Sequence, residues 1–335
     1  MAVAVVVMAG ISCTLSGREM TIVEGLSAIW NHVIGNEPEV GTSEWLDAFM
    51  VWDVVMPRVV FAIVAGSGLA VCGTLMQGVM NNPLADPYTI GVSSGAVFGA
   101  VLAIVLGVSM IPGFGQFGIM GNAFLFGLVP IAFIMLLSSV SSNLSPVVII
   151  LMGIAISYFF SGITTIIMVG ADEDALADAY QWQIGSFYGT TWDDVPLALA
   201  VTLLGIVFAS LTYNKLNAMT AGDVVARTLG MDAKTYRMIT LVIVTLVAAT
   251  IVSMTGIIGF VGLVAPHMMR VVLGGNNRFV IPASMLAGSM ILMFADIVTR
   301  TIVDIDVPVG AVMSFIGAPI FLYLIIGRKG GRTFS

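Results

Sequence analysis

The chain has 335 residues, of which 59% are hydrophobic and only 9% are charged, and its mean hydropathy is +1.06. An average soluble domain carries about 25% charged residues, so this composition excludes a water-soluble domain and indicates a chain that lies largely in lipid. The net charge of −7 gives no reason to expect nucleic acid as a partner.

Apolar stretches near the ~20 residues that cross a hydrocarbon core recur from end to end, which predicts an all-α polytopic protein with one transmembrane domain over 1–335. The longest polar segments, 14–56 and 171–194, are expected to be loops. The ten predicted spans are 1–13, 57–79, 88–111, 119–140, 147–170, 195–212, 237–256, 258–271, 279–299 and 308–327.

Lysine and arginine are retained on the cytoplasmic side of membranes, so their positions predict the topology. Nine of the twelve fall in three segments: Lys215, Arg227, Lys234, Arg237, Arg270, Arg278, Arg328, Lys329 and Arg332. These segments are expected inside, with both termini, in a cell or inner membrane. Most acidic residues lie in 14–56, 171–194 and 296–306, which are expected outside.

Two predicted spans are short. Two helices must lie between the basic segments at 215–237 and 270–278, and at a rise of 1.5 Å per residue they fit only if at least one is short. Gly256, Gly259 and Gly262 mark a break there. Only about a dozen apolar residues form the first span. A cleaved signal peptide is the rival interpretation, but a basic leading segment is absent, so we expect a first helix whose start lies upstream.

A polar turn, NNPLADP, separates the second and third spans. Pro83 and Pro87 remove backbone donors and oppose helix. Asn82, Pro83 and Asp86 are therefore candidates for a polar path that is buried in protein or lines a cavity. The alternative is a well-capped turn. Small residues spaced four apart flank the turn and are read as packing seams. They are Ala62, Gly66, Ala70, Thr74 and Gly78 before it, and Gly91, Gly95 and Gly99 after it.

The sequence offers no metal or nucleotide site. Cys13 and Cys72 are too few for a thiolate site, and the two histidines, His32 and His267, are not at ligand spacing. GxxxxGK[ST] is absent. GFGQFG at 113–118 matches GxGxxG but follows an apolar helix, so a dinucleotide site is rejected on context.

Several collinear motifs resemble the FecCD-type permeases of ABC importers for iron–siderophore, haem and cobalamin, over nearly the whole chain after residue 50. The resemblance implies a cobalamin-permease-like fold. The first helix is shorter than in the family. The motifs are the segment from Arg58 to Ala100, QWQIGSF (181–187), ARTLGMDAKTYR (226–237), GIIGFVGLVAPHMMR (256–270), ADIVTR (295–300) and VPVGAVMSFIGAPIFLYLI (307–325).

The resemblance implies two permease copies, identical or closely paralogous, two cytoplasmic ATPases that use ATP and Mg²⁺, and an external binding protein. The chain itself is expected to be no enzyme and to bind no cofactor. Its internal loop at 213–237 is expected to contact the ATPase, with Asp223 as an N-cap, Gly230 as a C-cap and Asp232 starting the next helix. The candidate coupling residues are Asp223, Ala226, Arg227, Leu229, Gly230 and Met231.

Arg58 and Arg300 lie on the expected acidic side. The resemblance implies that they meet carboxylates of the binding protein; the alternative is an internal pair, such as Arg58 with Asp53 or Arg300 with Asp296. A further family arginine, three residues before Arg58, is Val55 here. The family also implies a pathway on the fifth and tenth spans, lined by Ser157, Ser161, Thr164, Thr165 and Ser314.

The predicted function is therefore the permease subunit of an ABC importer for a metal chelate, first of all an iron–siderophore complex, with cobalamin or haem as alternatives. An ion-coupled secondary transporter is the alternative from another class. Such proteins carry ionisable residues near the bilayer midplane, whereas the acids here fall mostly in outer loops or at outer helix ends. A membrane enzyme lacks support, because HExxH and paired intramembrane acids are missing from the sequence.

Overall fold

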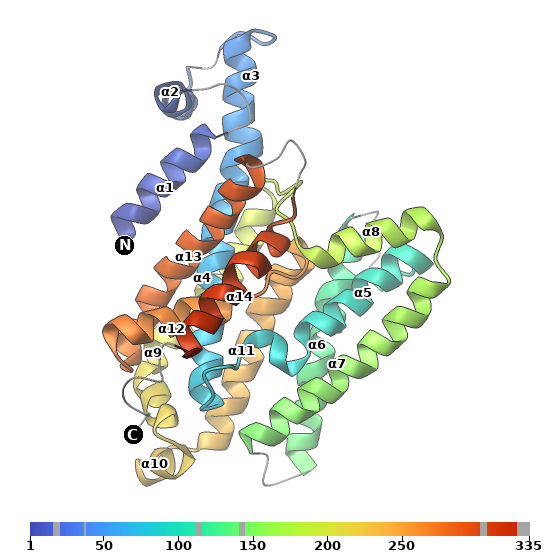
Figure 1. Cartoon of the computed structure of the whole chain (residues 1–335), viewed down its shortest axis with the longest axis vertical. Coiled ribbons are helices and arrows are strands. Elements are labelled where there is room, and N and C mark those ends of the chain that lie inside the picture. Colours follow the sequence, from blue (N-terminus) through green and yellow to red (C-terminus); the bar gives the residue numbers. More distant parts are fainter. Residues whose placement is uncertain (16–20, 37, 111–115, 141–144, 302–306, 327–335) are drawn as a thin grey trace.

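The computed structural model describes residues 1–15, 21–36, 38–110, 116–140, 145–301 and 307–326, and every regular element in them is helical (Figure 1). The all-α prediction is confirmed. The elements are α1 (Ala2–Thr14), α2 (Ile22–Val33), α3 (Ser43–Phe49), η1 (Met50–Val55), α4 (Met56–Val79), η2 (Pro87–Ile90), α5 (Val92–Leu106), α6 (Gln116–Val140), α7 (Pro146–Val169), α8 (Glu173–Ile184), α9 (Asp194–Thr220), α10 (Asp223–Thr228), α11 (Ala233–Thr255), α12 (Val261–Leu273), α13 (Asn277–Thr301) and α14 (Val309–Ile326).

Each of the ten predicted spans coincides with an apolar helix of the described residues. Six helical segments are long and apolar enough to cross a bilayer: those that contain α4, α6, α7, α9, α11 and α13. The other four, α1, α5, α12 and α14, are shorter apolar helices. The chain is therefore a polytopic membrane protein, in which short helices accompany the full-length spans.

The two long polar segments contain helices that sequence patterns missed. Thr21 begins α2 with a reciprocal capping box to Glu24, Thr42 caps α3, and Asp172 caps α8. α3, η1 and α4 then form one continuous helical segment from Ser43 to Val79. Because hydropathy detects apolar runs, it does not reveal polar helices that begin at side-chain caps.

α4 is the centre of the bundle: in the most apolar 18-residue stretch of the segment Ser43–Val79, 89% is buried inside the protein. It packs against α13, α9, α12 and α11. A Cβ atom built on Gly66 would lie 2.5 Å from the backbone oxygen of Gly288 in α13, so the two backbones touch. Gly95 and Gly99 bring α5 equally close to α6. The packing interpretation of the small-residue stripes is confirmed.

The predicted break before the short helix α12 is also confirmed. α11 ends at Thr255, Gly256 has φ of +73°, and α12 starts at Val261. Pro266 lies inside α12, which continues to Leu273. The third predicted span starts later than expected: Pro87 to Ile90 form the short 3-10 helix η2, and Gly91 with φ of +95° connects it to α5.

We predict that Gly73→Ala lowers the stability of the bundle by about 1–3 kcal/mol or more, because overpacking forces backbones apart. A Cβ atom at this position of α4 would lie far inside contact distance of the Gly262 carbonyl oxygen in α12. The measurement is the thermal unfolding midpoint in detergent. Gly162→Ala is the matched control, since a Cβ there meets nothing within 4 Å. Equal midpoints for the two variants would contradict the close α4–α12 contact.

Candidate functional site

The loop between α9 and α11 carries the candidate coupling residues, and Figure 1 shows its helix α10 at one end of the molecule. The predicted cap at Asp223 is wrong: Gly222, with φ of +105°, occupies the N-cap position, and Asp223 is the first helical residue. The predicted C-cap is also shifted by one residue: Leu229 is the C-cap, and Gly230 follows it with φ of +78°. Asp232 begins α11 as predicted, accepting hydrogen bonds from the amides of Lys234 and Thr235.

Asp223 does not cap α10 because its carboxylate pairs with Arg237, 14 residues later in α11. The Arg237 side chain is only 3% exposed, and its Nε also donates to the carbonyl oxygen of Val79 at 2.8 Å. That carbonyl is the last of α4, one of the four that a helix leaves without an internal partner. One guanidinium group therefore joins α10, α11 and the end of α4.

α10 presents a partly apolar outer surface. Ala226 is fully buried against the bundle, whereas Val224 is 76% exposed and Leu229 is 70% exposed. Arg227 and Gly230 are also exposed. Leu229, Gly230 and Met231 border a cavity of about 470 Å³ beside Tyr236. Of the candidate coupling residues, Ala226 therefore holds the helix in place, and Arg227, Leu229 and Gly230 face outward.

The polar turn after α4 divides into two parts. Asn82 and Pro83 border a cavity of about 600 Å³ together with Gln77 and Arg270, whose side chains are hydrogen-bonded to each other. Asp86 is buried instead, and its carboxylate caps η2 by accepting hydrogen bonds from the amides of Tyr88 (3.1 Å) and Thr89 (2.9 Å). The capped-turn interpretation therefore describes Asp86, while Asn82 and Pro83 lie beside open space.

The candidate pathway hydroxyls lie on α7 and α14. Ser161, Thr165 and Ser314 are exposed, Ser157 is half-buried and Thr164 is buried. Several donate to a carbonyl of their own helix one turn back: Ser157 to Gly153, Thr165 to Ser161 and Ser314 to Gly310. Large apolar side chains are exposed beside them, among them Tyr158, Phe159, Phe315 and Tyr323. The exposed surface around these hydroxyls is thus mainly apolar, and the lining role stays a prediction.

Arg58 and Arg300 share one buried carboxylate, that of Asp296 in α13. Arg58 Nε contacts one carboxylate oxygen, and Arg300 lies 3.0 Å from the other. Of the alternative internal pairs, Arg300–Asp296 is confirmed, whereas Arg58 pairs with Asp296 and not with Asp53. Both arginine side chains are about one-tenth exposed. Their docking role stays a prediction, and in this conformation both guanidinium groups already have internal partners.

Arg300, the second arginine beside Asp296, is also held by the C-terminal end of α1. Arg300 donates to the carbonyl oxygens of Ser12 (3.1 Å) and Leu15 (2.9 Å), where α1 ends. Helix C-termini carry partial negative charge and unpaired carbonyls, so they favour a guanidinium group. Asp296 is 238 residues from Arg58, too far for sequence spacing to indicate the pair.

Sequence reasoning identified QWQIGSF as a motif but assigned it no role. In the structure it ends α8, where the amide of Ser186 donates to the Thr255 oxygen of α11 at 2.7 Å. The amide of Gly310, in α14, donates to the Gly185 oxygen at 3.0 Å. Gly185, Gly256 and Gly310 permit these contacts, because a Cβ atom on any of them would overlap neighbouring backbone. Three helix ends are therefore joined at one point.

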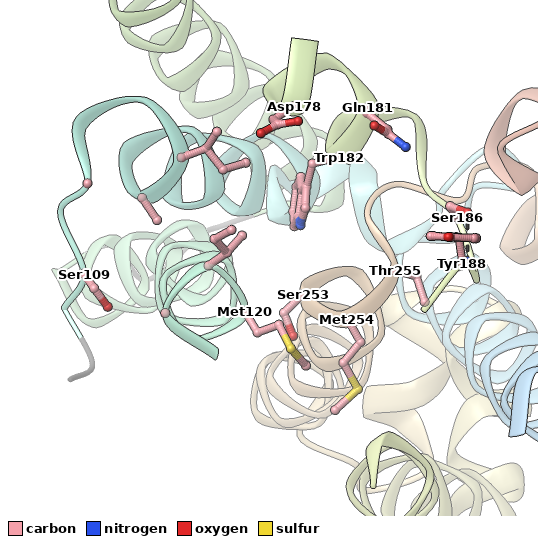
Figure 2. A pocket seen from close by; sticks show the side chains of 15 residues that line it. Ser109, Met120, Asp178, Gln181, Trp182, Ser186, Tyr188, Ser253, Met254 and Thr255 are labelled. Carbon is pink, nitrogen blue, oxygen red and sulfur yellow. Dashed lines mark hydrogen bonds between the residues drawn. The ribbon is translucent and has the colours of Figure 1, made fainter. Parts of the chain in front are cut away.

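A cavity of about 590 Å³ lies beside this junction, between α5, α6, α8 and the end of α11. Figure 2 shows Trp182 extending from α8 toward Met120 and Ser253, with Asp178 and Gln181 on the same helix. The lining combines an aromatic ring, thioethers and polar groups. Its lining residues all lie outside the loop at 213–237 that carries the candidate coupling residues.

We predict that Arg237→Met destabilises the fold by about 1–3 kcal/mol, because it leaves the Val79 carbonyl buried without its donor. Asp223→Asn is the matched control: it keeps an acceptor oxygen for Arg237 and should change stability little. Hydrogen exchange of the α10 amides should rise strongly in Arg237→Met and weakly in Asp223→Asn. Similar exchange in both variants would contradict the role given to Arg237.

Burial raises the pKa of Asp86 to about 6, from an ordinary value of 3.8. Because this acid is harder to ionise in the folded protein, it destabilises the fold progressively as pH rises from 3.8 to about 6, and constantly above. Asp86→Asn retains an acceptor for η2 and does not ionise. Its stability relative to the wild-type protein should therefore increase between pH 4.5 and pH 7 in thermal unfolding experiments. A constant difference over that range would contradict the buried carboxylate.

Comparisons with known proteins agree with this architecture. The profile of the FecCD transport family matches residues 2–327. The cobalamin import permease BtuC of Halobacterium salinarum is 34% identical over 84% of this chain and 74% of its own. The iron(3+)-hydroxamate import permease FhuB of Bacillus subtilis is 31% identical over 98% of this chain and 84% of its own.

A solved structure of a transporter assigned to the metal-chelate ABC type, in an inward-facing conformation, superposes with a TM-score of 0.84. Its sequence is 28% identical, and the match covers 97% of each chain. The fold, the order of the helices and the family profile over nearly the full length therefore agree. The chain belongs to the FecCD transport family.

Proposed function

We propose that this chain is the transmembrane subunit of a binding-protein-dependent ABC importer for a metal chelate, with an iron–siderophore complex as the first candidate. The observation that carries the proposal is α10: a two-turn helix with exposed Val224 and Leu229, tied through Arg237 to the most buried helix of the bundle. A helix this short is marginal alone, so its fixed position suits contact with a partner.

The partner is proposed to be a cytoplasmic ATPase, two copies of which act on two permease subunits. The chain contains no GxxxxGK[ST] sequence to hold nucleotide phosphates, so energy comes from another subunit. The basic residues around α10 favour a cytoplasmic position for this end and, by the count of spans, for both termini. α2, α3 and α8 then lie on the external side, where a binding protein delivers the substrate.

These contacts support the following mechanism. Nucleotide binding moves the ATPases, which displace α10; Arg237 conveys that displacement to the last turn of α4 and the turn after it. α4 touches α13 and α12 through glycine backbones, an arrangement that favours sliding of whole helices over side-chain rearrangement. The surface of α7 and α14 would then alternate between outward and inward access to a path between the copies.

The substrate class rests on the relatives, which carry cobalamin in one case and an iron(3+)-hydroxamate in another. Both substrates are large metal chelates. A secondary transporter, the alternative class, would need unpaired acidic residues in the membrane that bind protons or sodium. The buried acid of α13, Asp296, is paired with two arginines and is accounted for structurally. Haem is the third candidate chelate.

We predict that Leu229→Asp abolishes binding-protein-stimulated ATP hydrolysis and co-purification of the ATPase, because it places a charge on the exposed apolar side of α10. The fold should persist, since Leu229 is 70% exposed. Val40→Asp is the matched control for co-purification of the ATPase, since Val40 is 82% exposed and lies between α2 and α3 at the other end of the molecule. Normal assembly in Leu229→Asp, or its loss in both variants, would contradict the assignment of α10.

Uptake into proteoliposomes that contain the permease, its ATPase and its binding protein tests the substrate. A ferric hydroxamate should be transported with ATP inside and should stimulate hydrolysis, while cobalamin and haem should do so weakly. Transport driven by an ion gradient without nucleotide would contradict the importer class. Transport of cobalamin or haem in place of the ferric chelate would change only the substrate.

A further inference from the structure

We propose that α2 lies along the membrane surface as an interfacial helix, with one apolar side among the lipid headgroups and upper acyl chains. This inference needs only the membrane location of the bundle and is independent of the transport function. α2 lies next to α1, at the end of the molecule away from α10, and Figure 1 shows it nearly end-on while α3 and α4 run along the bundle. It therefore crosses the direction of the spans.

The exposed side of α2 and the residue after it is apolar. Its members recur at the three- and four-residue spacing of one helix face. They are Val23 (73% exposed), Leu26 (47%), Trp30 (64%), Val33 (62%) and Ile34 (55%). Glu24 and Asn31 form a polar edge beside this face, and Ser27 lies at its border. An amphipathic helix with tryptophan and aliphatic residues on one side is typical of the bilayer interface.

The opposite side of α2 is already packed against the protein. Gly25 fits against Thr14 of α1, with no room for a Cβ atom. The His32 ring stacks on Trp52 with centroids 4.0 Å apart, and Trp52 in turn packs against Trp192 at 5.4 Å. Trp192 Nε1 also donates to the Trp52 oxygen at 2.9 Å. These contacts fix the rotation of α2, so its apolar face points away from the bundle.

Lipid is the occupant that this position favours, because the face continues an apolar surface of α1. Val3, Val6 and Val7 of α1 are each more than half exposed. Leu26 reaches toward α1 near Gly10, where a Cβ atom would lie 4.0 Å from its side chain. The two helices thus present one continuous apolar surface, which follows the length of α1 and then continues along α2 at the end of α1. Tryptophan at such a boundary, here Trp30, is typical of the headgroup layer.

The helix also needs a surface to bury this face. α2 has 12 residues, a length at which an isolated helix is marginal in water. Its capping box fixes the start but contributes only about 0.5–2 kcal/mol. Burial of the five apolar side chains in the interface would stabilise both the helix and its orientation.

Site-directed spin labelling in liposomes of phosphatidylethanolamine and phosphatidylglycerol tests the proposal. The native cysteines, Cys13 and Cys72, are buried and are replaced by alanine. Nitroxides at Trp30→Cys and Val33→Cys report on the apolar face, and Glu24→Cys on the exposed polar edge is the control. Collisions with oxygen should exceed those with a water-soluble nickel chelate at the first two positions, and the reverse should hold at Glu24→Cys.

Nickel collisions as frequent at Val33→Cys as at Glu24→Cys would place the face in water and overturn the proposal. So would low collision rates with both reagents, which would indicate a protein cover; recovery on dilution with unlabelled chain would identify a second copy. Brominated phospholipids give a measurement without cysteine variants. They should quench a larger share of tryptophan emission in the wild-type protein than in Trp30→Phe, and equal quenching would contradict the lipid contact.

Discussion

The contact on which the coupling account depends is the guanidinium group of Arg237, held between the Asp223 carboxylate and the last carbonyl of α4. A helix of six residues has few internal hydrogen bonds, so α10 keeps its shape through its neighbours. Asp223 pairs with Arg237, and Gly222 occupies the cap position of α10. The link joins α10 to α4, the central helix of the bundle.

Glycine contacts determine what happens to a displacement once it reaches α4. In lipid, apolar side chains gain little from contacting one another, so close backbone approach and hydrogen bonding hold helices together. Gly66 against Gly288 and Gly73 against Gly262 place the α4 backbone directly on α13 and α12. At the other end, Gly185, Gly256 and Gly310 join α8, α11 and α14. We therefore expect the helices that connect the two ends to shift as rigid bodies.

Local signals in the sequence predicted much of this fold. Ten apolar runs gave the apolar helices, Gly256 marked the break before α12, and Asp232 was recognised as a helix start. The stripe containing Gly66 indicated a packing seam that the structure confirms. These features depend on residues within a few turns of one another, which is the range over which propensity, capping and periodicity act.

Contacts between residues far apart in the sequence could not be predicted from local patterns. Asp223 resembled an N-cap, and only the position of Arg237 in space explains why it is not one. Arg58 shares Asp296 with Arg300 across 238 residues, and the helix α2 carries too many polar residues to register as a span. QWQIGSF stood out as a motif, but its contacts with Thr255 and Gly310 come from two other helices.

Hydrogen exchange on the assembled permease and ATPase, with and without nucleotide, tests the central claim most directly. The account predicts that nucleotide changes exchange in α10 and also in the last turn of α4 and the turn at 80–86, and that Arg237→Met confines the change to α10. An unaltered response at the end of α4 in Arg237→Met would show that the signal takes another route and would contradict the account.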